Sequence, residues 1–433
     1  MSARPLFKRH SKPQPPREPH TLLNDEAAPA VIIARRAAGR LREGHLWVYR
    51  SDMETLLPTR GEAELQPGEL VTLLDNRRIP LGSALYSSAS QIALRKVSDK
   101  TRLTRAAYLS DLRTRTEAAI ALRQTMLNEQ TDSCRLLFSE ADGTPGIVAD
   151  KYNDLVLLQL LTQGTAQDDV REILASVFAS RLNPATILER PDPRIRELEQ
   201  LGMPGSTPLV ATQPDMPKTA TIATLNGLRF HYDANAGQKT GAFLDQRLNY
   251  AAAARYAHGR ALDVCTYQGG FALHLATVCD SVTGIDQSRA ALEVAEQNLA
   301  LNRNQIKAGV DWWEGDAFEV LRAWEQQGER YDTIVLDPPA FAKSKRASEA
   351  AMRGYKELNL RAMKMLRPGG RLITCSCSHH VSLADFTATV ASAAADAGRR
   401  VRILEIRGAA PDHPEVLTLP ETIYLKCLVL SVD

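Results

Sequence analysis

Short apolar runs separated by turn residues fill the first part of the chain, from Val31 to about Lys100. Turn residues such as Gly44 and Pro67-Gly68 interrupt the pattern before any run becomes long. Short strands at regular spacing are typical of a small barrel rather than of a helical domain. We therefore predict a small N-terminal β-barrel over residues 31–100, with the strands VIIARR, HLWVYR, ELVTLLD, LGSALYS and QIALRKV.

The middle of the chain mixes the helical and the strand-like period. Apolar positions recur at helical spacing over residues 101–123, between many arginines. Strand-like and helical runs then follow, and they read CRLLFSE, GIVADKY, DLVLLQLL, DDVREILASVFASRL and ATILER. Together they predict a central α+β domain over residues 101–230, in which the segment 202–217, rich in proline, glycine and threonine, is a loop or hairpin tip.

Strands and helices alternate in the last part of the chain, which we take as residues 231–433. The strand candidates are RALDVC, SVTGID, GVDWWEG, YDTIVLD and RLITCSC, and the helix candidates are FALHLATVC, SRAALEVAEQNLALN, AFEVLRAWEQQ and residues 355–366. This alternation predicts an α/β domain with a doubly wound parallel sheet. Ligands of such sheets bind at the carboxyl ends of the strands, so these ends are where chemistry is expected.

Composition limits the class of protein. The 433 residues exceed one ordinary domain, and 44% of them are apolar, which is enough for each domain to bury a core. No stretch approaches the ~20 continuous apolar residues of a membrane helix, and the first 30 residues lack the apolar run of a secretory signal. We expect residues 1–30 to form a disordered, basic, proline-rich tail, and the protein to be cytoplasmic without a membrane partner.

Charge and cysteine usage leave the substrate open. The net charge of +2 and the pI near 8.2 neither demand nor exclude nucleic acid, so any basic surface has to be local. The six cysteines show no disulfide spacing and are expected to be reduced thiols.

The first strand of the C-terminal domain carries Asp263 and ends in the turn Thr266-Tyr267-Gln268-Gly269-Gly270. Paired glycines at a strand-to-helix turn let the backbone approach a ligand closely. The next three strands end near Asp286, Asp316 and Asp337. An acidic residue ~20 positions after the glycine turn is placed to accept hydrogen bonds from ribose hydroxyls, and Asp316 is placed to read an adenine edge.

Strand-end features in this order match the layout of class I methyltransferases, which have a Rossmann-like fold. A nicotinamide-binding fold is the rival, but residues 266–271 lack its Gly-x-Gly-x-x-Gly turn, and it does not account for the segment 337–339. Taken singly, a strand-terminal aspartate is more often a turn former or a helix N-cap. We predict S-adenosylmethionine as the cofactor, bound by Asp263, Tyr267, Gly269, Gly270, Asp286, Asp316 and Asp337.

Two consecutive prolines, Pro338 and Pro339, fix an extended backbone and hold Asp337 and Phe341 at the mouth of the expected crevice. An extruded base needs an aromatic face to stack on and a polar group that reads its edge, and Phe341 and Asp337 supply both. The alternative is that Phe341 packs in the core and Asp337 caps a helix.

The fifth strand ends in the run 375–380, which reads CSCSHH. At strand spacing, Cys375, Cys377 and His379 would share one face. Three interpretations compete: buried packing cysteines, a metal site and a nucleophilic thiolate. The metal site lacks a second ligand pair at zinc-like spacing, so no metal is predicted.

A thiolate solves a chemical problem, because carbon 5 of cytosine is a poor nucleophile. Addition of the thiolate to carbon 6 makes carbon 5 nucleophilic enough to accept a methyl group. Cys377 is nearer the strand end than Cys375, so Cys377 is the candidate nucleophile.

On these residues the chain resembles the cytosine-5 methyltransferases of large-subunit ribosomal RNA that carry an N-terminal PUA domain. The resemblance covers nearly the whole chain from about residue 31. The motifs that carry it are 44–49 (GHLWVY), 87–92 (SSASQI), 137–146 (LFSEADGTPG), 239–247 (KTGAFLDQR), 267–271 (YQGGF), 337–341 (DPPAF) and 376–378 (SCS).

The resemblance implies an RNA-binding barrel, a loop at 239–247 that folds over the cofactor or the target base, and a nucleophile at Cys377. It also implies a cytosine of large-subunit ribosomal RNA as the target, while a homodimer stays open. Residues 1–30 are an extension without a role in this resemblance. We assign Gln246 and Arg247 to the cofactor, and Lys239, Thr240, Phe243, Arg35 and Arg36 to the RNA.

Two other functions stay open. Methylation of an exocyclic base amine would leave Cys377 structural, but the usual motif of such enzymes is Asn-Pro-Pro, and this chain has Asp337 in its place. A non-catalytic RNA-binding or ribosome assembly factor is the other, and the intact cofactor motif argues against it.

Overall fold

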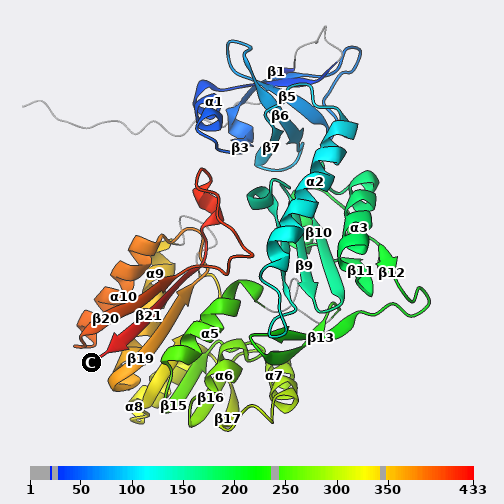
Figure 1. Cartoon of the computed structure of the whole chain (residues 1–433). Coiled ribbons are helices and arrows are strands. Elements are labelled where there is room, and N and C mark those ends of the chain that lie inside the picture. Colours follow the sequence, from blue (N-terminus) through cyan, green and yellow to red (C-terminus); the bar gives the residue numbers. More distant parts are fainter. Residues whose placement is uncertain (1–19, 22–27, 236–242, 342–347) are drawn as a thin grey trace, which may run out of the picture. The chain divides into compact units, whose positions relative to one another are not determined.

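The computed structural model describes residues 20–21, 28–235, 243–341 and 348–433. The chain forms two compact units that divide between Tyr108 and Leu109 (Figure 1). Most of the predicted tail of residues 1–30 lies outside the described residues, but His20–Thr21 form a short strand, β1, which is not tail-like. Within the described ranges, no helix combines the length and apolar character needed to cross a membrane.

The first unit is built on a seven-stranded sheet. Its other strands are β2 (Ala30–Ile33), β3 (Trp47–Tyr49), β4 (Met53–Leu57), β5 (Leu70–Leu74), β6 (Pro80–Tyr86) and β7 (Ile92–Ser98). The strand order is β1-β4-β2-β5-β6-β7-β3. All five predicted strand runs therefore contain a strand, and β1 and β4 are additional ones.

One of those predicted runs, VIIARR, is wrong in its second half. Strand β2 ends at Ile33, and helix α1 (Arg35–Arg42) begins two residues later. Ala37, Ala38 and Leu41 are buried along one side of this helix, at the spacing of successive helical turns. The change from a period of two to a period of about 3.6 falls inside the run, and six residues are too few to reveal it.

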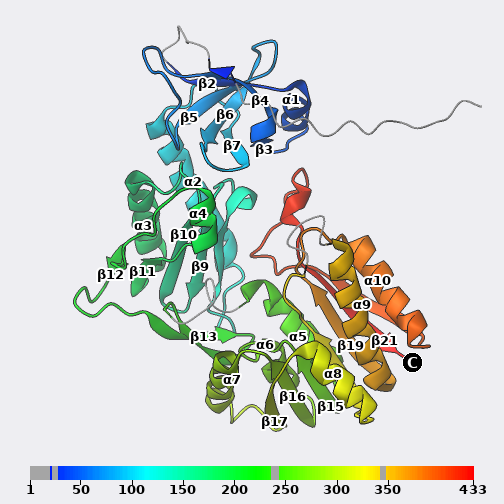
Figure 2. The same cartoon turned by 180° about the vertical axis from the view of Figure 1, so that it is seen from behind.

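Helix α2 (Arg105–Gln124) leads into the second unit, whose first part is α+β as predicted. The five-stranded sheet has the order β12-β11-β10-β9-β8, and α3 lies beside β10 and β11 (Figures 1 and 2). Strand β10 is buried along its whole length, which explains why its sequence is apolar without alternation. The bounds are β8 (Cys134–Phe138), β9 (Ile147–Tyr152), β10 (Leu155–Leu160), α3 (Asp168–Leu182), β11 (Thr186–Glu189), α4 (Pro193–Leu198) and β12 (Val210–Ala211).

A hairpin that the sequence did not predict, β13 (Ala220–Leu225) and β14 (Leu228–Asp233), follows this sheet. Its Tyr232 stacks on Tyr152 of β9, with ring centroids 3.8 Å apart.

The predicted doubly wound sheet is present at the C-terminal end. Strands β17-β16-β15-β18-β19 pair in parallel in this order, and β21 pairs antiparallel with both β19 and β20. The strand bounds are β15 (Arg260–Val264), β16 (Ser281–Asp286), β17 (Gly309–Glu314), β18 (Tyr331–Leu336), β19 (Leu366–Ser376), β20 (Val401–Arg407) and β21 (Lys426–Val432).

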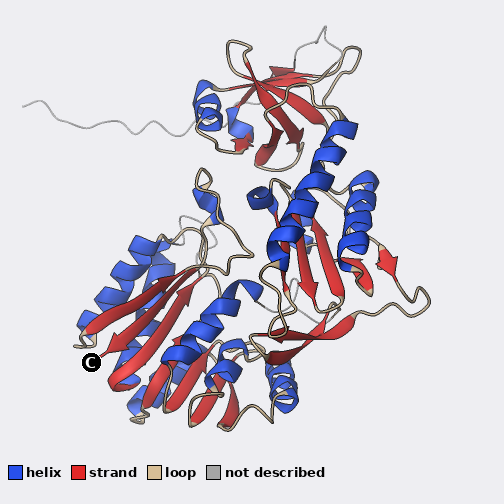
Figure 3. Ribbon diagram, in the orientation of Figure 1, coloured by secondary structure: helices blue, strands red, loops and turns tan. Residues whose placement is uncertain are grey.

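Helices cover both faces of this sheet (Figure 3). Alternate residues of β18 explain why: Val335 belongs to the core under α5 and α6, whereas Ile334 and Leu336 belong to the core under α8, α9 and α10. The helix bounds are α5 (Arg247–Tyr256), α6 (Gly270–Leu275), α7 (Arg289–Leu301), α8 (Ala317–Gln326), α9 (Ser348–Met365) and α10 (Leu383–Asp396). The elements α5, α10, β20 and β21 were not predicted.

Candidate active site

The turn after β15 has an uncommon backbone conformation. Cys265 and Tyr267 have φ angles of 65° and 52°, and Gly269 has a φ of 85°. Residues other than glycine rarely adopt positive φ values, which cost about 1–3 kcal/mol each. Two such residues in one turn show that the surrounding structure imposes the geometry, as is frequent at ligand sites.

Asp263 lies beneath this turn and is fully buried. Its Oδ2 accepts hydrogen bonds from Thr266 Oγ1 at 2.6 Å and from the backbone N–H of Ala272 at 2.9 Å. Burial raises the pKa of Asp263 to about 7. Its Oδ1 has no hydrogen-bond partner within the described ranges. These contacts position the turn, and the predicted contact with the cofactor stays a prediction.

The two glycines of the turn have different roles. Gly269 supplies the positive φ at the N-cap of α6. A Cβ atom on Gly270 would lie 2.6 Å from the ring of Tyr250, so this glycine is required for the packing of α6 against α5.

Asp286 and Asp316 lie at neighbouring strand ends beside the turn. Asp286 Oδ2 accepts a hydrogen bond from the backbone N–H of Tyr267 at 2.9 Å. Asp316 caps α8 by accepting from two N–H groups of its first turn, and its other oxygen accepts from Gln287. Both carboxylates therefore act as turn or cap residues, and both keep further lone pairs for a ligand. Together with the turn they form one continuous rim at the carboxyl ends of the strands.

Asp337 follows β18 on the other side of the turn, and its backbone N–H donates to Val264 O at 3.2 Å. Gln246 Nε2 donates to Asp337 Oδ1 at 2.9 Å. Burial raises the pKa of Asp337 to about 8, and the carboxylates of Asp245 and Asp263 act in the same direction. A carboxyl that keeps its proton near neutral pH can donate a hydrogen bond as well as accept one.

Phe341 is half-buried against other aromatic rings. Its centroid lies 4.9 Å from that of Tyr355 and 5.9 Å from that of Phe318. These contacts fit the alternative in which Phe341 packs in the core. Stacking of a base on the exposed part of the Phe341 ring stays a prediction.

The expected common face for Cys375, Cys377 and His379 is wrong, because β19 ends at Ser376. Cys375 is fully buried in the sheet opposite Cys427, and burial raises its pKa well above the ordinary value. Cys377 lies beyond the strand end, is partly exposed, and has its Sγ 4.0 Å from Pro338 O. Of the two thiols, only Cys377 is therefore both accessible and next to the Asp-Pro-Pro segment.

Lys426 is a neighbour of Cys377 that the sequence reasoning missed. Its Nζ donates to Ser378 O and to Tyr424 O, each at 2.7 Å, and it interacts electrostatically with Cys377. Only 3% of Lys426 is exposed, and this burial lowers its pKa to about 8. A lysine at the start of the apolar run KCLVL is the signal that could have found it, because a buried charge requires partners.

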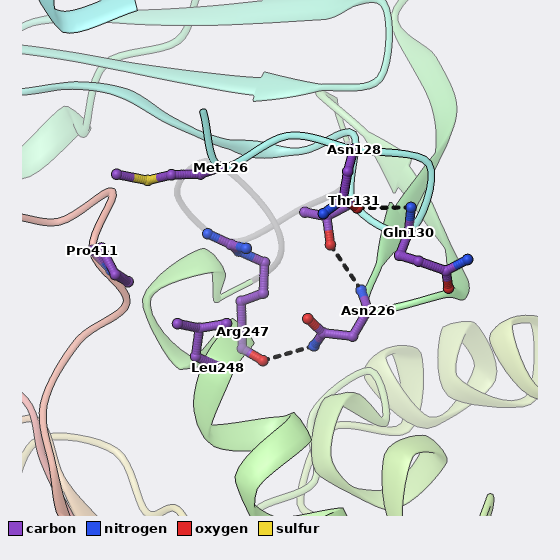
Figure 4. Close-up of a pocket in the computed structure, with 8 residues that line it drawn as sticks. All are labelled: Met126, Asn128, Gln130, Thr131, Asn226, Arg247, Leu248 and Pro411. Carbon is purple, nitrogen blue, oxygen red and sulfur yellow. Dashed lines mark hydrogen bonds between the residues drawn. The ribbon is translucent and has the colours of Figure 1, made fainter. Parts of the chain in front are cut away.

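Gln246 and Arg247 are consecutive and buried, yet their side chains have different partners. Gln246 bonds to Asp337, whereas Arg247 Nη2 lies 3.4 Å from Asp412 Oδ1 and its guanidinium lines a pocket of about 490 Å³ (Figure 4). The structure thus places Gln246 at the crevice and Arg247 beside it. Asp412 is the second residue that the sequence reasoning missed.

The loop residues predicted to contact RNA are only partly described. Lys239 and Thr240 lie outside the described residues. Phe243 is 44% exposed, and its ring contacts that of Tyr267 edge-on at 5.2 Å. Phe243 therefore lies against the turn after β15.

The predicted RNA contacts of the first unit, Arg35 and Arg36, are both exposed at the start of α1. Arg36 and Arg40 form ion pairs with the buried carboxylate of Asp52. An arginine with a carboxylate partner is less available to phosphate, so Arg35 is the stronger candidate of the two predicted residues.

Known proteins match nearly the whole length of this chain. A family model described as S-adenosylmethionine-dependent methyltransferase matches residues 213–428, and a model of a PUA-like domain matches residues 31–99. The Ribosomal RNA large subunit methyltransferase I of Klebsiella pneumoniae (strain 342) is 33% identical over 408 residues, which cover 93% of this chain and 98% of that protein. Its namesake from Erwinia tasmaniensis is 35% identical over 399 residues, which cover 92% and 97%.

A solved structure has the same fold. SMU.776, solved in complex with SAH, superimposes with a TM-score of 0.77 at 18% identity, over 93% of this chain and 99% of that one.

Proposed function

Since this chain belongs to the ribosomal RNA large subunit methyltransferase I family and is an S-adenosylmethionine-dependent methyltransferase with a PUA-like domain, we propose that it methylates carbon 5 of a cytosine in large-subunit ribosomal RNA. The observation that carries the proposed chemistry is the position of Cys377. It is partly exposed beyond β19, beside Pro338, while Cys375 is buried in the sheet.

The crevice residues fit the cofactor. Asp286 and Asp316 present carboxylate oxygens at adjacent strand ends, and the strained turn at 265–269 joins them. Bound S-adenosylmethionine supplies an electrophilic methyl group. The proposed ligands remain Asp263, Tyr267, Gly269, Gly270, Asp286, Asp316, Asp337 and Gln246, whereas the contacts of Arg247 favour another role for that residue.

The reaction begins with the Cys377 thiolate, which adds to carbon 6 of the cytosine and forms a carbon–sulfur bond. Protonated Asp337 donates a hydrogen bond to ring nitrogen 3, which draws electron density from carbon 6 and favours this addition. Carbon 5 then takes the methyl group, whose bond to the sulfonium breaks, so that S-adenosylhomocysteine is the co-product. A base removes the proton from carbon 5, and the carbon–sulfur bond to Cys377 breaks to release the thiolate.

Lys426 supports the thiolate in this scheme. Its ammonium group, held by two backbone carbonyls, is the positive charge next to the Cys377 segment. A nearby cation favours the ionised thiol.

The test is RNA that carries 5-fluorocytosine. Fluorine cannot leave carbon 5 as a proton does, so the covalent adduct is trapped, and mass spectrometry is expected to place it on Cys377. Cys377→Ser should lose nearly all activity and keep cofactor binding, and the matched variant Cys375→Ser should keep most activity. An adduct on Cys375 would contradict the geometric argument. Methylation by Cys377→Ala without any adduct would favour the exocyclic-amine reaction instead.

Bisulfite mapping of ribosomal RNA from cells with and without the gene tests the substrate. We expect one cytosine to lose its protection when the gene is absent, and unchanged maps would reject the RNA part of the proposal.

The proposed domain organisation is a PUA-like domain at 31–100, a central domain at 101–230 and a catalytic domain at 231–433.

A further inference from the structure

A polar pocket lies beside the crevice, on the side of α5 that Arg247 faces. Its volume is about 490 Å³, within the range of small-ligand sites. Three segments that are far apart in the sequence build it: the loop 126–131, the β13–β14 turn and the loop at Pro411, which meet at the start of α5 (Figure 4). The lining residues are Met126, Asn128, Gln130, Thr131, Asn226, Arg247, Leu248 and Pro411.

Hydrogen bonds within its wall hold the pocket in shape. Asn128 Oδ1 accepts from the backbone N–H of Gln130 at 2.8 Å, and Thr131 Oγ1 accepts from the backbone N–H of Asn226 at 3.1 Å. Asn226 Nδ2 in turn donates to Arg247 O at 2.8 Å, which ties the pocket wall to α5.

Arg247 brings a guanidinium group to the wall of the pocket. Arg247 is only 4% exposed and lines the pocket, and its buried Nε has no hydrogen-bond partner in the described part of the chain. A guanidinium carries five N–H donors, and those that face the pocket can donate to a ligand there. Asp412 already balances the charge of Arg247, so the ligand need not be a strong anion.

The lining chemistry suits a nucleotide. Amide side chains at Asn128 and Gln130 can both donate and accept, as the edge of a base requires. Met126, Leu248 and Pro411 supply apolar surface for the flat face of a base. The lining contains none of the carboxylates at the strand ends that we assign to the cofactor, so the pocket is separate from that site.

We infer that this pocket binds a nucleotide of the substrate RNA that neighbours the target base. The inference rests on the proposed function, and one geometric fact supports the proximity. Gln246, which bonds to Asp337, and Arg247, which lines the pocket, are adjacent in the chain. A base in the pocket would thus lie next to one held at Asp337, and the pocket would contribute to the choice of sequence around the target.

The test is the double variant Asn128→Asp with Gln130→Glu. Both changes preserve shape and the oxygen of Asn128 that accepts a hydrogen bond, but each adds a negative charge to the pocket. Arg247 is left intact because its removal would leave the buried carboxylate of Asp412 without its partner. The matched control is Gln326→Glu with Gln327→Glu, which adds the same charge at the end of α8, a helix that packs on the other face of the sheet from α5.

The probe is protein-free large-subunit ribosomal RNA, in filter binding at one fixed salt concentration. We expect the pocket variant to bind it about tenfold or more weakly, because added carboxylates repel RNA, and to bind S-adenosylhomocysteine as the natural protein does. The control should change neither affinity. Ultraviolet cross-linking of the natural protein should place RNA on the peptide that contains residues 126–131.

Two results would overturn the inference: unchanged RNA affinity in the pocket variant, or a loss of cofactor affinity with RNA affinity intact. Mass spectrometry of the methylated nucleoside separates this question from the proposed reaction. A product other than 5-methylcytosine, together with weakened RNA binding by the pocket variant, would reject the reaction and support the pocket.

Discussion

The substitution Asp337→Asn should stabilise the protein, although Asp337 is a proposed catalytic residue. Burial raises the pKa of this carboxyl from its ordinary value of 3.8 to about 8. The folded state therefore holds a proton that the unfolded state has released between pH 4 and 8. Stability that is fully present below pH 4 is lost as the pH rises through this window. Asparagine carries no charge and keeps an oxygen that can accept the hydrogen bond from Gln246.

The magnitude follows from the window. Each pH unit between the ordinary pKa of 3.8 and pH 7 lowers the free energy of unfolding by ~1.4 kcal/mol. The largest loss of stability at pH 7 is therefore about 4 kcal/mol. Asp337 is partly exposed, so we expect about half of this, ~2 kcal/mol, as the gain of the variant at pH 7. The gain should vanish near pH 4, where the natural carboxyl is protonated in both states.

Urea unfolding at pH 4.5, 6 and 7.5 measures this gain. Three of the four tryptophans, Trp312, Trp313 and Trp324, lie in the second unit and report its unfolding by fluorescence. The control is Asp332→Asn on the same strand. Hydrogen bonds from Arg260 N and Arg367 lower the pKa of Asp332 against the opposing effect of burial, so its variant should lose stability at pH 7. An Asp337→Asn variant that is less stable at pH 7.5, or whose gain does not depend on pH, would refute the reasoning.

Other variants test the remaining contacts. Lys426→Met should slow the alkylation of Cys377 by iodoacetamide about tenfold at neutral pH if ~1.4 kcal/mol of thiolate stabilisation is lost, and an unchanged rate would exclude Lys426 as its support. Asp286→Ala should lose roughly 2–4 kcal/mol of affinity for S-adenosylhomocysteine in calorimetry, and Asp280→Ala, at the other end of the same strand, should lose none. Deletion of residues 1–100 should weaken RNA binding and keep cofactor affinity, and a salt-insensitive RNA affinity of the full chain would contradict phosphate contacts.

Local pattern was sufficient for most of the catalytic sheet. The runs that predict β15, β16 and β18 are short and mostly apolar, and acidic or glycine-rich turns follow them. Helix α3 matches the predicted run DDVREILASVFASRL residue for residue, because acidic residues begin it and Asn183 ends it in a left-handed conformation. In such segments, propensity, period and end signals agree, so neighbours in the sequence determine the element.

Other elements could not be predicted locally. The run VIIARR contains a strand end and a helix start, and only the buried positions Ala37, Ala38 and Leu41 show the change. The end of β19 at Ser376 is likewise a property of the sheet, because β21 stops pairing there. Strand spacing alone extends the strand to His379 and wrongly places Cys377 within the strand.

The sequence by itself determined the class of fold and the order of the strand-end aspartates, and it predicted Cys377 rather than Cys375 as the nucleophile. The tertiary structure alone decided the environment of these groups. Lys426 approaches Ser378 from 48 positions later in the chain, and Asp412 meets Arg247 from a distant loop. The raised pKa of Asp337 arises from burial and from Asp245 and Asp263, which lie on other segments. Desolvation and charge interactions depend on distance in space, and a linear sequence does not specify which segments fold against one another.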